Sequence, residues 1–494
     1  MAAAVIIAAA LVSTSLIVVP LETTKTSTST ATSVVTTTLP QVTSTSTTTL
    51  PPTTVTETSV STSATTTSYL ICCVTTTATT TITVTVNPGP TPACGSPTLQ
   101  GALPQNSKSH AAASSNAGTP VKLSDPAPVT IGTSSDGSAT NSSSERKTVI
   151  AAGLIWVFYT DGCNIVYQTS GDGGATWSSP PTIAKTGISR GWFFTLAQNG
   201  TTLYFVVSAS DGSTNGTIVF RYGTMESNGT VSWSIPEQDV PYNVGVGTVP
   251  TVAVDTSGSV WVAIETLGGT GGTVPTNSRA IEVFKSTAGV WSQVFNVAGL
   301  ADYPRPILLA LTSGKMALEI LTETPGERTA VIYTTADGGS TWSSPVSTPQ
   351  GLDNILTLSS VSVGDTVYSV TSDTSGGIFL WTYTYGGSSF VGPTALARCC
   401  SEGYNDATIS TDGASYLFVA YSNSSSVIYE ASTDLGKSWT SSTAITTTEN
   451  FIQPGSLATN YLTSGRISIV WTEQTSIASL FNVRFASVTY VLPL

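Results

Sequence analysis

The sequence predicts an all-β protein, a β-propeller of four-stranded blades preceded by a low-complexity stalk rich in Thr and Ser. Beyond residue 120, short runs of β-branched and aromatic residues alternate with Gly, Asn, Asp and Ser turns, and one phrase ending in an aromatic residue recurs at a nearly constant interval. Before residue 120 the amino-acid composition differs, and 31 of the 50 residues 21–70 are Ser or Thr. The chain therefore divides into three predicted parts, residues 1–20, 21–118 and 119–494.

The first part, residues 1–20, is uncharged and mostly apolar, and it is just long enough to cross a bilayer as a helix. It lacks the basic start and the clear small-residue cleavage site of a signal peptide. A cleaved signal peptide and a retained N-terminal membrane anchor both fit, and a buried core segment is the weaker alternative. Either favoured alternative predicts an extracellular or cell-surface protein, secreted or held to the membrane through residues 1–20.

The second part, residues 21–118, has too few large apolar side chains to offset the entropy of ordering its backbone. Residues 21–70 carry only Glu22, Lys25 and Glu57 as charges. Thr/Ser-rich segments interleaved with Pro are typical of O-glycosylated, mucin-like stalks. The alternating residues 82–86 could form a strand, and residues 93–119 resemble a further linker.

The third part contains the repeated phrase, which has three clear copies, SGDGGATW, TADGGSTW and STDLGKSW. The clear copies end at Trp177, Trp342 and Trp439, and weaker copies end at Trp233, Trp291 and Phe390. The intervals between these aromatic residues are 56, 58, 51, 48 and 49 residues. This period accommodates four short strands and their turns, which favours a propeller over a sandwich.

The last blade needs a strand from elsewhere in the chain. After Trp439 the sequence supplies three strands, at residues 455–460, 466–472 and 482–489. The segment 124–131 resembles the outer-strand phrases that follow the first two clear copies. We predict that this N-terminal strand completes the last blade and closes the ring without a free edge. Seven blades result, and six is the alternative if one degenerate unit is an insertion.

The repeated phrase is the Asp-box, or BNR repeat, and residues 119–494 resemble the sialidase-like β-propeller superfamily. The residue types suit a tight turn, because the carboxylate accepts backbone N–H bonds, Gly adopts positive φ and the aromatic ring packs on the sheet. We therefore predict a structural role for the Asp-box residues, which are Asp172, Trp177, Asp337, Trp342, Asp434 and Trp439.

The predicted topology separates two ends of the ring. Asp-box turns lie at one end, and the connections between blades lie at the other, where the resemblance implies a ligand over the central axis. Residues that enter the innermost strands there are Glu145, Arg146, Arg190, Trp192, Tyr242, Tyr303, Arg305, Arg398, Glu402, Tyr404 and Asp406. Loops between second and third strands add Asp161, Glu323, Glu327, Arg328 and Asp373.

The resemblance implies a set of site residues. Sialidases hold a sugar carboxylate with three arginines, attack with a Tyr that has a Glu partner, and use an Asp as acid/base. Here the resemblance implies Arg146, Arg305 and Arg398 as the triad, Tyr404 with Glu402 as the nucleophile pair and Asp161 as the acid. It implies ligand contacts for Arg190, Tyr303, Trp192 and Asp406. The family's Arg-Ile-Pro motif is replaced by Ser144-Glu145-Arg146-Lys147-Thr148.

Three functions remain open at this point. The first is an exported, cell-surface head that binds or acts on glycans, or another cell-surface ligand, through a central pocket at the end opposite the Asp-boxes. The second is an exo-sialidase, or another glycoside hydrolase with two carboxylates such as Asp161 and Glu402. The third is a non-catalytic structural envelope protein, in which the arginines cap sheet ends or pair with acids. Residue spacing does not choose between enzyme and binding protein.

The amino-acid composition limits which partners and cofactors we expect for this protein. With 29 acidic and 17 basic residues and a net charge of −12, we expect no nucleic-acid partner. The single histidine, His110, argues against His-ligated zinc and Ser-His-Asp hydrolysis. No metal-ligand set stands out and no cofactor is expected, although loop oxygens could hold calcium.

Cysteines and sequons fit export. Disulfides are the expected fate of the cysteines, which are Cys72, Cys73, Cys94, Cys163, Cys399 and Cys400. Of these, Cys163, Cys399 and Cys400 fall at the predicted ligand end and are the disulfide candidates there. Asn-x-Ser/Thr sequons, expected in loops of a surface glycoprotein, begin at Asn141, Asn199, Asn215, Asn228 and Asn423.

Overall fold

A computed structural model describes the chain from residue 121 to residue 491, within a compact unit that spans Pro97–Leu494. The gaps in this description are residues 125–126, 189–192, 210–216, 235, 243–245, 268–278, 288, 325–326, 350–354, 399–405, 424–425, 447–451, 454–455, 460–464 and 478. The predicted leader, the stalk and the proposed strand at residues 82–86 lie outside the described residues.

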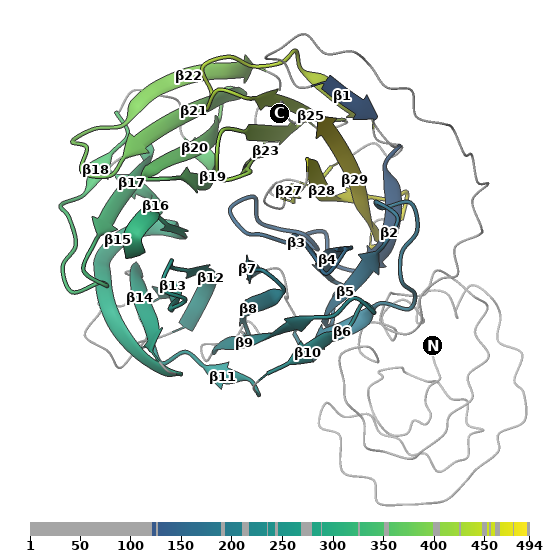
Figure 1. The fold of residues 1–494 in the computed structure, drawn as a ribbon, viewed down its shortest axis with the longest axis horizontal. Coiled ribbons are helices and arrows are strands. Elements are labelled where there is room, and N and C mark those ends of the chain that lie inside the picture. Colours follow the sequence, from purple (N-terminus) through teal and green to yellow (C-terminus); the bar gives the residue numbers. More distant parts are fainter. Residues whose placement is uncertain are drawn as a thin grey trace, which may run out of the picture. The chain divides into compact units, whose positions relative to one another are not determined.

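The described residues form a ring of antiparallel four-stranded blades around a common centre (Figure 1). Blade 1 consists of β3 (Thr148–Ala151), β4 (Leu154–Thr160), β5 (Ile165–Ser170) and β6 (Thr182–Lys185). Blade 2 consists of β7 (Phe194–Asn199), β8 (Thr202–Ser208), β9 (Ile218–Met225) and an outer position shared by β10 (Val231–Trp233) and β11 (Gln238–Asp239).

Blades 3 and 4 share a strand. Blade 3 consists of β12 (Val246–Val254), β13 (Val260–Leu267), β14 (Arg279–Thr287) and the first half of β15 (Val290–Ala310). The second half of β15 is the innermost strand of blade 4, which continues with β16 (Met316–Thr324), β17 (Glu327–Thr335) and β18 (Val346–Ser347). A 3₁₀ turn, η2 (Thr312–Gly314), joins β15 to β16. Because β15 runs on without a break, the two blades form one seven-stranded sheet.

The remaining blades follow the same order. Blade 5 consists of β19 (Ile355–Val363), β20 (Thr366–Asp373), β21 (Gly377–Thr384) and β22 (Val391–Arg398). Blade 6 consists of β23 (Asp406–Thr411), β24 (Leu417–Ser422), β25 (Ser426–Ser432) and β26 (Thr443–Thr446). Blade 7 contains β27 (Ala458–Thr459), β28 (Arg466–Gln474) and β29 (Phe481–Val491). The prediction of seven four-stranded blades is confirmed.

An N-terminal strand closes the ring, as predicted. The outer position of blade 7 is filled by β2 (Val129–Ser134), which pairs antiparallel with β29, and β1 (Val121–Ser124) pairs with the far end of the same strand. The first and last parts of the domain are therefore hydrogen-bonded to each other. This pairing leaves the third strand of blade 7 without an open edge.

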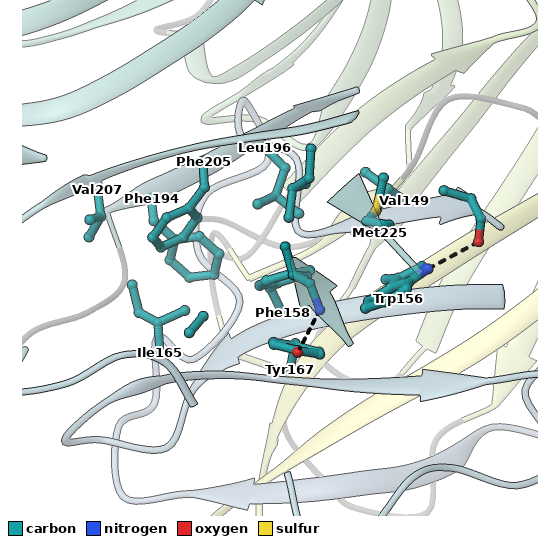
Figure 2. Close-up of a cluster of buried hydrophobic side chains, with 14 of the residues drawn as sticks. Val149, Trp156, Phe158, Ile165, Tyr167, Phe194, Leu196, Phe205, Val207 and Met225 are labelled. Atoms are coloured by element: carbon teal, nitrogen blue, oxygen red, sulfur yellow. Dashed lines mark hydrogen bonds between the residues drawn. The ribbon is translucent and has the colours of Figure 1, made fainter. Parts of the chain in front are cut away.

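The core consists of seven apolar clusters, one at each interface between neighbouring blades. Strand β4 illustrates the cause, because successive side chains of a strand point to opposite faces. Trp156 and Phe158 pack toward blade 2, whereas Val157 and Tyr159 pack toward blade 7. Figure 2 shows the cluster between blades 1 and 2, where Phe158 stacks on Tyr167 at 5.0 Å between ring centroids.

The aromatic residue that ends each repeated phrase packs at the interface with the preceding blade. Trp177 lies edge-on to Phe485 of blade 7 at 4.7 Å between centroids, and Trp342 stacks on Phe295 of blade 3 at 4.5 Å. Trp439 packs in the cluster between blades 5 and 6. The period in the sequence is therefore the period of blade-to-blade packing.

The Asp-box carboxylates lie in tight turns after the third strands. Asp337 accepts hydrogen bonds from the backbone N–H of Thr341 at 2.9 Å and from its hydroxyl at 2.6 Å. Asp172 and Asp434 accept the equivalent pairs of bonds in their own turns. Gly339 has φ +95°, and a Cβ there would lie 2.9 Å from Val294 of the neighbouring blade.

Candidate functional site

The two ends of the ring are defined by the meander. We call the end with the Asp-box turns the Asp-box end, and the end with the blade-to-blade connections the connection end. The β2–β3 connection reaches into the middle of the ring (Figure 1). Its residues 139–147, which we call the axial segment, are buried except for half-buried Ser144. The candidate site is built on this segment.

Hydrogen bonds hold the axial segment to blades 7 and 1. The Thr140 hydroxyl donates to the Ser456 carbonyl at 2.7 Å and lies 2.8 Å from the Thr472 hydroxyl. The Thr160 N–H donates to the Ala139 carbonyl at 3.1 Å. Small side chains such as Ala and Ser allow a segment to pass this close to strand ends, since bulky ones would collide with the packed blades.

Arg146 connects blades that are far apart in the sequence. Its guanidinium donates to the Ser360 carbonyl of blade 5 at 3.2 Å, and to the carbonyl and hydroxyl of Thr459 in blade 7 at 3.5 and 3.4 Å. Its backbone N–H donates to the Thr195 hydroxyl of blade 2 at 2.9 Å. The side chain is 7% exposed, so it bridges blades inside the ring.

Glu145 and Lys147 form a buried ion pair beside it, 2.8 Å apart. Lys147 also donates to the Phe194 carbonyl and lies 3.5 Å from the centroid of the Phe194 ring. Burial raises the pKa of Glu145 to about 7 against the opposing effect of Lys147, and burial lowers the pKa of Lys147 to about 8. Burial therefore disfavours the charged form of each partner, while their mutual attraction favours it.

Arg305 approaches the axial segment from blade 4. Its Nη1 donates to the Ser142 hydroxyl at 3.0 Å, and the side chain is half-buried. Burial lowers the pKa of Arg305, whereas the charges of Glu145, Glu265 and Asp406 oppose that shift. Arg305 is thus a partly exposed cation that is electrostatically coupled to buried carboxyl groups.

Asp406 brings blade 6 into the same cluster. Its Oδ2 accepts a 2.6 Å hydrogen bond from the Leu457 N–H. Burial raises its pKa to about 7, while the Leu457 N–H, the Ser143 hydroxyl and the Arg305 charge lower it. Within the described part of the chain, Oδ1 of Asp406 and Oε1 of Glu145 are buried without hydrogen-bond partners. Buried oxygens that lack a donor disfavour the charged form of both carboxyl groups.

Blade 3 contributes a further pair at this end. Glu265 is paired with Arg279, and it accepts a 2.5 Å hydrogen bond from the Thr248 hydroxyl. Burial raises the pKa of Glu265, and the charges of Arg279 and Arg305 oppose this. Charged groups of blades 1, 3, 4 and 6 are thus electrostatically linked around Arg305.

The structure describes some of the sequence-predicted site residues. It brings Arg305 and Asp406 together with the axial segment, and it turns Arg146 toward blades 5 and 7. Asp161 accepts hydrogen bonds from the N–H groups of Cys163 and Asn164 at 2.8 and 2.7 Å, so its carboxylate organises the β4–β5 turn.

The rest of the predicted set is described less fully or not at all. Arg398 pairs in register with Gly377 at the end of β22, and Tyr303 lies within β15. Outside the described residues lie Arg190, Trp192, Glu402, Tyr404, Cys399 and Cys400. Cys163 is disulfide-bonded, and the other five cysteines of the chain are outside the described residues.

Sequence reasoning placed Glu145 at this end of the ring without giving it a role, and it missed the roles of Lys147, Glu265 and Arg279. A local signal existed for Glu145 and Lys147, because Glu145-Arg146-Lys147 places three successive charges directly before a strand in a chain with 9% charged residues. Glu265 and Arg279 had no such signal, since each closes or opens an ordinary strand and the pairing depends on the β13–β14 register.

Two further findings concern the described residues as a whole. No group of three or more His, Cys, Asp or Glu side chains among them could hold a metal ion. None of their helices has the length and apolar character needed to span a membrane.

Comparison with known proteins adds fold similarity. No protein-family model matches the chain, and no curated protein matches it in sequence. Among solved structures, the BP39L lectin from Burkholderia pseudomallei is 11% identical, with a TM-score of 0.52, covering 72% of this chain and 99% of the lectin.

Sialidases are also among the similar structures. The Hadza microbial sialidase Hz136 is 14% identical with a TM-score of 0.42, covering 67% of this chain and 73% of that one. The Trypanosoma rangeli sialidase bound to the inhibitor DANA is 10% identical with a TM-score of 0.43, covering 63% and 56%. At these identities the likeness is one of fold, and the seven-bladed ring itself confirms the predicted β-propeller.

Proposed function

We propose that this chain is an exported surface protein whose propeller is a glycan-binding head carried on an O-glycosylated stalk. In this proposal the connection end is the binding end, and residues 1–20 direct or anchor the chain at the membrane. Arg305 is the central ligand contact. The observation that carries the proposal is that half-buried Arg305 donates to Ser142 of the axial segment and is electrostatically coupled to the buried carboxyls of Glu145 and Asp406.

The chemistry of this cluster suits an acidic or hydroxyl-rich sugar. A guanidinium offers several N–H donors in a plane, and it binds a carboxylate or sulfate through paired hydrogen bonds. Glu145 and Asp406 are buried, so in this proposal they act on a ligand through their charges on Arg305 and not by direct contact. A lectin shares the fold, so the fold is compatible with sugar binding.

Binding without hydrolysis is favoured by the contacts of Arg146. A sialidase-type triad requires three guanidiniums with donors directed at one substrate carboxylate. Arg146 instead directs donors to the Ser360 carbonyl and to Thr459. Because Arg146 already uses these donors inside the ring, its contacts support a binding protein rather than a hydrolase whose arginine triad includes Arg146.

The test is a glycan array probed with the purified full chain. Arg305→Ala removes the proposed contact and should weaken binding by about tenfold to a hundredfold, since charge-assisted hydrogen bonds contribute about 1.5–3 kcal/mol each. The matched control is Arg466→Ala, at the Asp-box end of β28, which should bind as the wild type does. Equal binding by wild type and Arg305→Ala would refute the assignment.

Glycoside hydrolysis is the second candidate function. The observation in its favour is that two buried carboxyl groups, Glu145 and Asp406, both have pKa values of about 7 beside one arginine. Such groups suit general acid and base roles near neutral pH. Turnover of a fluorogenic sialoside or another glycoside that is lost in both Glu145→Gln and Asp406→Asn would establish it. Silence on arrays and substrates together would favour the structural envelope role.

A further inference from the structure

We infer that Asn199 and Asn228 are N-glycosylation sites, and that the buried sequon at Asn141 is not modified in the folded protein. This inference rests on the export included in the proposed function, because the modifying enzymes act on exported chains. Both proposed sites read Asn-Gly-Thr. Both belong to blade 2 and lie at the Asp-box end, Asn199 at the end of β7 and Asn228 in the turn between β9 and β10.

Asn228 occupies the turn between β9 and β10. The side chain is exposed, and its Oδ1 accepts hydrogen bonds from the Thr230 hydroxyl at 2.7 Å and from the Thr230 N–H at 3.0 Å. The backbone closes the turn independently, through the Glu226 N–H to the Thr230 carbonyl at 2.9 Å. In the described part of the chain the amide nitrogen Nδ2 has no hydrogen-bond partner, so it is free to be modified.

Asn199 is the last residue of β7, directly before the turn that leads to β8. It is exposed, and the next residue, Gly200, has φ +60° with no atom within 4 Å of a Cβ placed there. The turn therefore projects into open space. A glycan at this position would extend from the ring without displacing a packed side chain.

Asn141 contrasts with both sites. It belongs to the axial segment, is 8% exposed, and is followed by Ser143 at 1% exposure. A transferase cannot reach this amide in the folded protein, and a sugar attached earlier would have to fit inside the packed ring. Asn423 is half-buried and its Oδ1 accepts the Ser426 N–H at 2.7 Å, while Asn215 lies outside the described residues.

The reaction is a glycosyl transfer from a lipid-diphosphate-linked oligosaccharide. A bond forms between Nδ2 of the asparagine and the anomeric carbon of the sugar, the bond from that carbon to the phosphate oxygen breaks, and the amide loses one proton. The lipid diphosphate leaves with the bonding electron pair, and no oxidant or reductant takes part. Glycans added at the Asp-box end leave the connection end of the ring uncovered.

The test is glycopeptide mass spectrometry of the full chain isolated from cells that produce it. We expect a glycan on Asn199 and Asn228 and none on Asn141. Asn199→Gln and Asn228→Gln should each remove one glycan from the intact mass. Thr230→Ala should abolish modification of Asn228, whereas the matched variant Thr230→Ser should keep it, since Ser also completes a sequon.

Labelling of intact cells with a membrane-impermeant reagent separates this inference from the proposal of export. A chain that is labelled at the surface but bears no glycan on either asparagine would overturn the inference and leave export standing. A chain that is neither labelled nor glycosylated would overturn both. Modification of Asn228 that persists in Thr230→Ala would show that the sequon is not what is recognised. A glycan on Asn141 of the folded protein would show that exposure does not decide which asparagine is modified. Either result would overturn the inference.

Discussion

The two ends of the ring use the same type of side chain in opposite ways. At the Asp-box end, Asp337 is exposed, and hydrogen bonds from Thr341 and Thr335 lower its pKa to about 2. At the connection end, Asp406 is buried, and burial raises its pKa to about 7 although it also accepts a backbone hydrogen bond. Local donors stabilise the charged carboxylate at one end, whereas loss of water destabilises it at the other.

The difference has a structural cause. The donors of an Asp-box come from residues within four positions of the aspartate, so each turn supplies its own partners. The connection-end cluster draws on blades 1, 3, 4 and 6, whose packing sets its partners and its burial. We expect the axial cluster to be sensitive to single changes, and the exposed carboxylates of the Asp-box turns to tolerate them.

The largest effect is expected from Lys147→Met in the axial segment. It leaves Glu145 buried without its ion-pair partner, which should cost about 3–5 kcal/mol of unfolding free energy. Chemical denaturation at pH 8 measures this, and adding Glu145→Gln should recover part of the loss. The control is Lys185→Met, in the partly exposed pair with Glu237, which should change stability by about 1 kcal/mol or less. Equal losses at both lysines would contradict the comparison.

A smaller loss is expected at the Asp-box end from Gly339→Ala. Its positive φ and the 2.9 Å approach of a Cβ to Val294 should together cost about 3 kcal/mol. Gly187→Ala provides the matched case, since Gly187 has φ +73° and no atom within 4 Å of a Cβ. That variant should lose only about 1 kcal/mol. Thermal unfolding of both variants tests whether packing against the preceding blade adds to the backbone strain.

The next effect concerns buried Glu319 in β16, whose carboxylate accepts hydrogen bonds from the Ser360 and Ser369 hydroxyls. Burial raises its pKa from 4.5 to about 7, so its favourable contribution is complete below pH 4.5 and is lost as pH rises through 7. The free energy of unfolding of Glu319→Gln, measured relative to wild type, should therefore be greater at pH 8 than at pH 5 by on the order of 1–3 kcal/mol. A stability difference from wild type that stays constant from pH 4 to 8 would argue against this.

The smallest effect is expected for Asp337→Asn. Because the folded pKa is lowered from 3.8 to about 2, the carboxylate contributes stability above pH 3.8 that is lost as pH falls through 2. Asp337→Asn has no carboxylate to protonate at this position, so it should not show this loss of stability as the pH falls. Acid titrations of wild type and variant followed by circular dichroism measure it, and identical curves between pH 4 and 2 would show that the turn bonds do not depend on the charge.

Much of the fold could be predicted from the sequence because its determinants are local and repeated. Each of the three clear copies carries its own turn aspartate, glycine and terminal aromatic residue, and the weaker copies continue the same period through the aromatic residue. The motif does not give the bounds of the strand that follows it, since β18 begins only at Val346, four residues after the aromatic residue. Trp342 packs on blade 3 in place of joining the sheet.

The sequence by itself determined the all-β class, the blade period and the closing N-terminal strand, because alternation and turn chemistry act over a few residues. Only the tertiary structure decided the candidate site. Arg305 reaches Ser142 across 163 positions of sequence, and Arg146 reaches Ser360 across 214. Contacts over such separations have no local signature, since they arise when closure of the ring brings the innermost strands of distant blades to one axis.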